Sequence, residues 1–127
     1  MNSKAAVFAF HEYFEEQKKE PVPLMLSVTI TDNSGRNLSG QMVEAFVESV
    51  RHAKPFSIGI NCALGATAML PFYDALHRVN ETWCSIYANA GLPNAFGEYD
   101  ETPEIYAKNM EPYGERQNLN IVGGCLS

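Results

Sequence analysis

Hydrophobic positions along the chain follow two alternating patterns. Apolar side chains recur at helical spacing in four segments, which cover residues 3–18, about 40–53, 67–80 and 103–113. Short apolar runs between these segments predict four strands, at residues 24–30, 56–61, 84–87 and 119–122. The strands start roughly 30 residues apart, which is typical of strand–helix–strand units. The pattern therefore predicts an α/β fold with a parallel sheet.

Residues that favour element ends support these boundaries. Pro21 and Pro23 end the first helix, and Ser39, Thr67 and Thr102 are expected to cap the three later helices. The apolar stripes expected on the helices are Ala6, Ala9, Phe10 and Tyr13; Val43, Phe46, Val47 and Val50; Met69, Phe72, Tyr73 and Leu76; and Tyr106, Met110 and Tyr113. The first strand shows little alternation, so we expect both of its faces to be covered.

Four parallel strands with four helices correspond to half of a (β/α)₈ barrel, which typically needs about 250 residues. The chain has 127 residues, and its first helix has no strand before it. A half barrel has two open edges and an uncovered inner face, which favour association. We therefore expect a chain that begins in the middle of a fold.

The amino-acid composition of the chain argues against nucleic-acid-binding and membrane proteins. Apolar residues make up 46 % of the chain, enough for a core, and the net charge of −6 disfavours binding to nucleic acid. No apolar run approaches the roughly 20 residues that cross a bilayer, and the N-terminus lacks the order of a signal peptide. We expect a cytoplasmic protein without membrane contact, in which thiols are more common than disulfides.

Two of the three cysteines closely follow predicted strands, Cys62 directly and Cys125 after two glycines. In a parallel sheet, Cys62 and Cys125 would lie on the same rim, where α/β proteins place their chemistry. Cys84 opens its strand and is expected to be a buried small hydrophobe. The histidines fall in predicted helices and are not expected as ligands: His11, His52 and His77. From spacing alone, a zinc site, a disulfide and ordinary buried thiols all remain open.

Four ordered motifs resemble the homocysteine-binding domain of cobalamin-dependent methionine synthase. They are residues 27–41 (SVTITDNSGRNLSGQ), 59–65 (GINCALG), 89–94 (NAGLPN) and 118–125 (NLNIVGGC). The first and third motifs, with residues 96–100 (FGEYD) following, favour methionine synthase over the related betaine-dependent enzymes. The resemblance covers about residues 4–125 and implies the C-terminal half of the barrel, strands five to eight.

The resemblance implies a catalytic zinc on three cysteines that binds homocysteine as a thiolate. The sulfur takes a methyl group from methylcobalamin, which separate domains carry together with folate. Cys62 and Cys125 match two of the zinc cysteines, and Asn89 matches an asparagine that resembles the oxygen ligand of the resting state. Thr29 and Thr31 lie where the family lines its substrate pocket.

The sequence also departs from the family pattern. Leu126 replaces the third zinc cysteine, so we expect weakened zinc binding and an isolated chain with little or no activity. Residues 1–127 are interpreted as a partial domain that is truncated at both ends. The loss of the family motif after Cys125 is attributed to a frameshift or to truncation of a longer gene. A split enzyme with an N-terminal half-barrel chain, a non-catalytic remnant that self-associates, and a Cys62–Cys125 disulfide are the alternatives.

Overall fold

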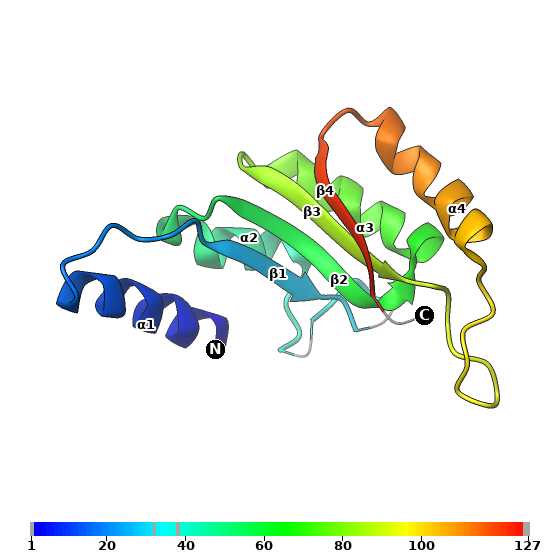
Figure 1. Ribbon diagram of the computed structural model, residues 1–127, viewed down its shortest axis with the longest axis horizontal. Coiled ribbons are helices and arrows are strands. Elements are labelled where there is room, and N and C mark those ends of the chain that lie inside the picture. Colours follow the sequence, from blue (N-terminus) through cyan, green and yellow to red (C-terminus); the bar gives the residue numbers. More distant parts are fainter. Residues whose placement is uncertain (1, 32, 38, 126–127) are drawn as a thin grey trace.

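A four-stranded parallel sheet forms the centre of the molecule in a computed structural model, which describes residues 2–31, 33–37 and 39–125, without the side chains of Cys62 and Ala63 (Figure 1). The strands follow each other in sequence order across the sheet. They are β1 (Met25–Thr29), β2 (Ser57–Gly65), β3 (Trp83–Asn89) and β4 (Leu119–Cys125). The predicted parallel sheet is confirmed.

One helix precedes the first strand, and the later helices connect successive strands. They are α1 (Asn2–Glu16), α2 (Val43–Val50) with a 3₁₀ turn η1 (Arg51–Ala53), α3 (Ala66–Val79) and α4 (Pro103–Glu115). Helix α3 packs between α2 and α4 and contacts both central strands. Helix α1 lies on the β1 side of the sheet and α4 on the β4 side (Figure 1). This arrangement is consistent with part of a (β/α)₈ barrel.

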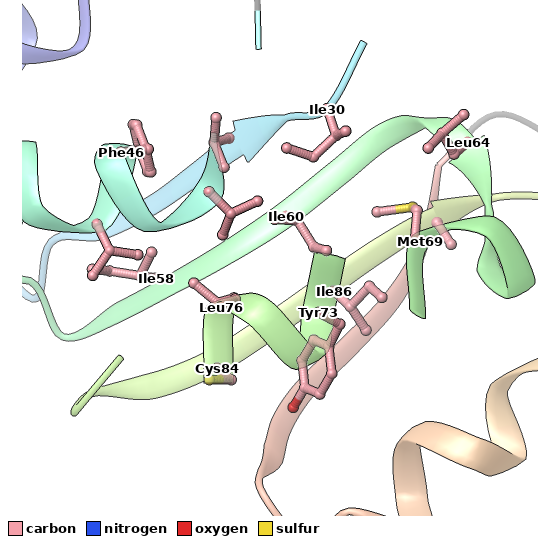
Figure 2. Packing of buried hydrophobic residues seen from close by; sticks show 14 of the residues in the cluster. Ile30, Phe46, Ile58, Ile60, Leu64, Met69, Tyr73, Leu76, Cys84 and Ile86 are labelled. Atoms are coloured by element: carbon pink, nitrogen blue, oxygen red, sulfur yellow. The ribbon is translucent and has the colours of Figure 1, made fainter. Parts of the chain in front are cut away.

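The hydrophobic core fills the space between the sheet and α2, α3 and α4. Ile58 and Ile60 of β2 and Cys84 and Ile86 of β3 are at most 2 % exposed (Figure 2). The stripes predicted for the three later helices face this core, with Phe72, Tyr106 and Met110 only partly buried. The local pattern of these helices therefore predicted their packing face correctly.

Strand β1 does not have two covered faces, so that expectation is wrong. Val28 is buried, whereas Ser27 is exposed and Met25 is 48 % exposed. The exposed face carries polar side chains that bond to each other: the Ser27 hydroxyl donates to Asn61 Oδ1 at 2.6 Å, and Asn61 Nδ2 donates to Thr29 Oγ1 at 3.2 Å. The open face of the sheet is therefore indicated by small polar residues in the strands, whereas the number of apolar residues in β1 gave no sign of it.

Of the three N-cap residues predicted from the sequence, one caps its helix in the structure. Thr102 accepts a hydrogen bond from the Ile105 amide at 3.4 Å and caps α4, as predicted. Ser39 instead donates to Asn37 Oδ1 at 2.8 Å, and α2 begins only at Val43. Thr67 lies inside α3, whose N-cap is Gly65. In α1 the expected stripe is also wrong, because the buried residue is Val7.

Three strands run further toward their carboxyl ends than predicted. Strand β2 continues through residue 62 to Gly65, β3 continues to Asn89, and β4 continues to Cys125. The candidate ligands are therefore strand residues rather than the first residues of loops. In the part of the chain that the structure describes, no helix is long and apolar enough to cross a membrane.

Candidate functional site

The carboxyl ends of three strands meet at one register level. Gly65 of β2 is the Cα partner of Asn89 in β3, and Asn89 is the Cα partner of Cys125 in β4. Directly paired residues of a parallel sheet present their side chains on the same face. The pairing thus brings together Asn89 and Cys125, which are 36 residues apart in sequence.

Asn89 is buried without full hydrogen bonding. Only 3 % of the residue is exposed, and its Oδ1 atom has no hydrogen-bond partner among the described residues. A buried carbonyl oxygen without a donor costs on the order of 1–3 kcal/mol, so most such atoms in proteins have a partner. A cation beside this oxygen would remove that cost.

Cys125 borders a cavity of about 370 Å³ between the ends of β3 and β4 and the start of α4. The cavity is lined by Ala88, Ala90, Glu101, Pro103, Tyr106, Gly124 and Cys125. The Tyr106 hydroxyl donates to the Gly123 carbonyl at 2.8 Å and lies 3.4 Å from the Ala88 carbonyl. Tyr106 therefore ties α4 to both strands and forms one wall of the cavity.

Cys62 lies in β2 where the pairing with β3 becomes irregular. Asn61 pairs with Tyr87 and Gly65 pairs with Asn89, so β2 has extra residues between these two positions. The Cys62 side chain and Leu126 fall outside the described part, so the predicted two-thiol site and the alternative disulfide remain predictions. Among the side chains that are described, no three from His, Cys, Asp and Glu gather as a metal site.

The two threonines predicted to line a substrate pocket have different surroundings. Thr29 ends β1 on the polar open face and accepts a hydrogen bond from Asn61. Thr31 closes the loop that follows, because both its amide and its hydroxyl donate to the Arg36 carbonyl, at 3.0 and 2.9 Å. The substrate role of both residues stays a prediction.

Cys84 and the histidines lie where the sequence predicted. Cys84 is 2 % exposed and sits five residues before Asn89 in β3, away from the rim. Burial raises the pKa of its thiol above the ordinary value, although hydrogen bonds to Asn80 and Tyr73 act in the opposite direction. His11 and His77 are helical residues and His52 lies in η1. None of these four belongs to the strand rim.

Two residues near the rim were not predicted. Asn61 joins β1 to β2 through both atoms of its amide group, directly before Cys62 in sequence. Glu101 precedes the α4 cap and lines the cavity at Cys125. The sequence signal for Asn61 was a polar residue inside an apolar strand, and for Glu101 an acidic residue next to a Thr-Pro helix start.

A sequence profile of the homocysteine S-methyltransferase family matches residues 1–126. The match includes the GINCALG segment with Cys62, the strand end at Asn89 and the GGC segment with Cys125. Because the matched region covers almost the entire sequence, the chain belongs to the homocysteine S-methyltransferase family.

Proposed function

We propose that this chain provides the thiol-binding rim of a cobalamin-dependent homocysteine S-methyltransferase, that is, of a methionine synthase. The observation that carries the proposal is the pairing of Asn89 with Cys125 at the sheet rim in a chain that matches the family over residues 1–126. The NAGLPN and FGEYD segments favour methionine synthase within the family. The cytoplasm is the proposed compartment, because it keeps thiols reduced.

The residues present have the chemistry that a zinc ion requires. Thiolates and an oxygen are ordinary zinc ligands. Cys62 and Cys125 would supply the sulfur atoms, and the buried Asn89 Oδ1, which has no partner among the described residues, would supply the oxygen. Zinc bound there would lower the pKa of the substrate thiol and so provide a sulfur nucleophile at neutral pH.

The proposed reaction is a methyl transfer to sulfur. The thiol proton of homocysteine leaves to solvent, the sulfur bonds to the methyl carbon, and the bond from that carbon to the donor breaks, with its electron pair staying on the donor. Methylcobalamin on a separate domain is the proposed donor. The role of this chain is to hold the sulfur at the rim, with Asn89 and Cys125 on its β3 and β4 sides.

Leu126 is the main reason to expect a weak site. It occupies the place of the third cysteine in the family motif, and its side chain has no donor atom for a metal. Two thiolates and a neutral amide oxygen neutralise the ion less well than three thiolates. We therefore propose that the isolated chain is inactive or nearly so, and that it represents the C-terminal half of the barrel.

The open sheet favours a second candidate role, in assembly. Within the described residues, β1 and β4 are the edge strands, and Ser27, Thr29 and Asn61 occupy an uncovered face. Unpaired edges promote association. The chain would then act either as one half of a split enzyme or as a non-catalytic, self-associating remnant. Light scattering over a concentration series distinguishes a monomer from these assemblies.

Zinc binding tests the proposed enzyme site. We would compare zinc affinity of the natural chain with a Leu126→Cys variant, and use Leu92→Cys as the control because Leu92 is a 64 % exposed rim residue. The proposal expects weak zinc binding that Leu126→Cys strengthens and Leu92→Cys does not. Tight zinc in the natural chain would show a replacement ligand, and zinc absent from every variant would refute the site.

A further inference from the structure

The apolar stripe that the sequence predicts on α1 lies largely on the surface of the single chain. Ala6, Ala9 and Tyr13 are exposed, Tyr13 by 52 %, and Phe10 is half-buried, whereas Val7 is the buried residue of this helix. Ala6, Ala9 and Tyr13 recur at helical spacing and therefore share one side of α1. An apolar helix side normally packs against another element. In one copy of the chain this side faces solvent.

Strand β4 has an uncovered apolar position on the helix side of the sheet. Val122 is the Cα partner of Ile86, whose side chain lies in the core on that side, so both side chains point the same way. Ile86 is fully buried, but Val122 is 58 % exposed. The helices of one copy therefore leave the outer edge of β4 open on the side where a helix would pack.

The two edges of the sheet complement each other. Strands β1 and β4 each pair with one strand within the described residues, and all four strands are parallel. Helix α1 precedes β1 and lies at the β1 edge, opposite to β4 (Figure 1). In a strand–helix–strand unit the helix covers the joint between two parallel strands. With β4 of one copy beside β1 of another, α1 would cover that joint and its apolar stripe would meet Val122.

Two such joints close a ring. A two-fold axis along the strand direction places β4 of each copy beside β1 of the other and keeps every strand parallel. Four strands from each copy then give the eight strands of a (β/α)₈ barrel. Closure removes all free edges, so the assembly stops at two copies.

The surface of the chain is large enough for such a contact. One copy exposes 7912 Å², whereas the relation between surface and mass of folded monomers gives about 6,700 Å² for 14.1 kDa. The excess of about 1,200 Å² per copy amounts to about 2,400 Å² for two copies, more than the roughly 1,200–2,000 Å² that stable interfaces bury. The exposed area therefore suits an obligate partner rather than a monomer.

We propose that two copies of this chain close one eight-stranded barrel, in which β4 of each copy pairs with β1 of the other and α1 covers the joint. This inference rests on the assembly role proposed above, and it names the partner and the contact surfaces. The open face with Ser27, Thr29 and Asn61 would then line the inside of the barrel. The rims of both copies would lie at the same end, because all strands run in one direction.

Charges placed on the two contact surfaces test the arrangement. Sedimentation over a concentration series should show a species of twice the 14.1 kDa chain mass and none larger. Ala9→Glu on α1 and Val122→Lys on β4 should each weaken dimerisation about 100-fold or more, because each buries an unpaired charge at both joints. Phe8→Glu is the matched control, since Phe8 is 68 % exposed and lies about 100° around α1 from Ala9. It should leave the dimer intact.

A mixture of the two charged variants locates the contact. An Ala9→Glu copy and a Val122→Lys copy have opposite charges at one joint and the natural residues at the other. We therefore expect heterodimers in the mixture, although neither variant dimerises alone. Circular dichroism of each variant beforehand shows that it is folded.

Several results would overturn the inference. They are a mixture without heterodimers, dimers that both charged variants leave unchanged, equal weakening by Phe8→Glu, and open assemblies of more than two copies. Each of these would leave association in another form, such as packing through the inner face. A natural chain that stays monomeric at every concentration would refute the assembly role and the inference with it, and would leave the proposed zinc site intact.

Discussion

Asn89 and Cys125 are direct Cα partners at the last paired position of β3 and β4. The first is buried with its Oδ1 atom unsatisfied among the described residues, and the second borders an open cavity. A polar acceptor and a thiol therefore lie at the same strand level at the rim. The parallel register, rather than closeness in sequence, creates this pair.

Two substitutions of Asn89 should change the affinity for zinc in opposite directions. Asn89→Ala removes the oxygen, and we expect zinc affinity to fall on the order of tenfold, the scale seen when groups around metal sites are removed. Asn89→Asp adds a negative charge at the same position and should increase the affinity. Competition with a chromophoric chelator measures both. Unchanged affinity in both variants would exclude Asn89 as a ligand.

Gly59 lies where two strands approach too closely for any side chain. A Cβ atom at Gly59 would be 1.9 Å from Ser85 Oγ and 2.4 Å from the Ser85 carbonyl oxygen. Because the backbone must move, we expect Gly59→Ala to reduce the free energy of unfolding by about 3 kcal/mol or more. Urea denaturation followed by circular dichroism measures this loss.

Gly114 offers the matched control for that substitution. It lies in α4, and a Cβ atom there would have no neighbour within 4 Å. Gly114→Ala should stabilise the fold by about 0.5–1 kcal/mol, because alanine has less conformational freedom to lose in a helix. Equal destabilisation by both substitutions would contradict the close approach at Gly59.

The amide group of Asn61 holds the open face of β1 and β2 together. Asn61→Ala removes both the bond from Ser27 and the bond to Thr29, so we expect a loss of about 1–2 kcal/mol in the free energy of unfolding. Thr29→Val removes only one of the two bonds and should cost less. Chemical denaturation of the two variants gives the comparison, and an equal or larger loss for Thr29→Val would contradict it.

The ion pair between Asp74 and Arg116 predicts a pH dependence. Arg116 Nε and Nη2 lie 2.5 and 3.0 Å from the Asp74 carboxylate oxygens, and this hydrogen bonding lowers the pKa of Asp74 below its usual 3.8. A lowered folded-state pKa gives stability that is present above the unfolded pKa and is lost as the pH falls through the folded pKa.

Asp74→Asn should therefore be less stable than the natural chain at pH 7, and the difference should vanish in strong acid. The effect is expected to be small, because the Asp74 side chain is 46 % exposed and solvent screens the pair. Thermal unfolding at several pH values between 2 and 7 measures it. A difference between the two proteins that does not change with pH would contradict the role of the ion pair.

Local patterns in the sequence determined the elements and most of the core. The stripe of Val43, Phe46 and Val47, the burial of Cys84 and the Thr102 cap were all predicted correctly, because each depends on periodicity or on a few neighbouring residues. The alternation of strands and helices along the chain predicted the parallel sheet. Recognition of the family likewise needed only the motifs of the rim, and the profile match confirms it.

Tertiary structure alone decided how distant segments meet. The register placed Asn89 beside Cys125, and the approach of α4 placed Glu101 at the same cavity. Ser39 bonds to its own loop instead of capping α2, and β1 has only one buried face. Except for the local bond from Ser39 to Asn37, these features arise from contacts between residues far apart in the chain, and periodicity carries no information about which strand end or loop comes next to another.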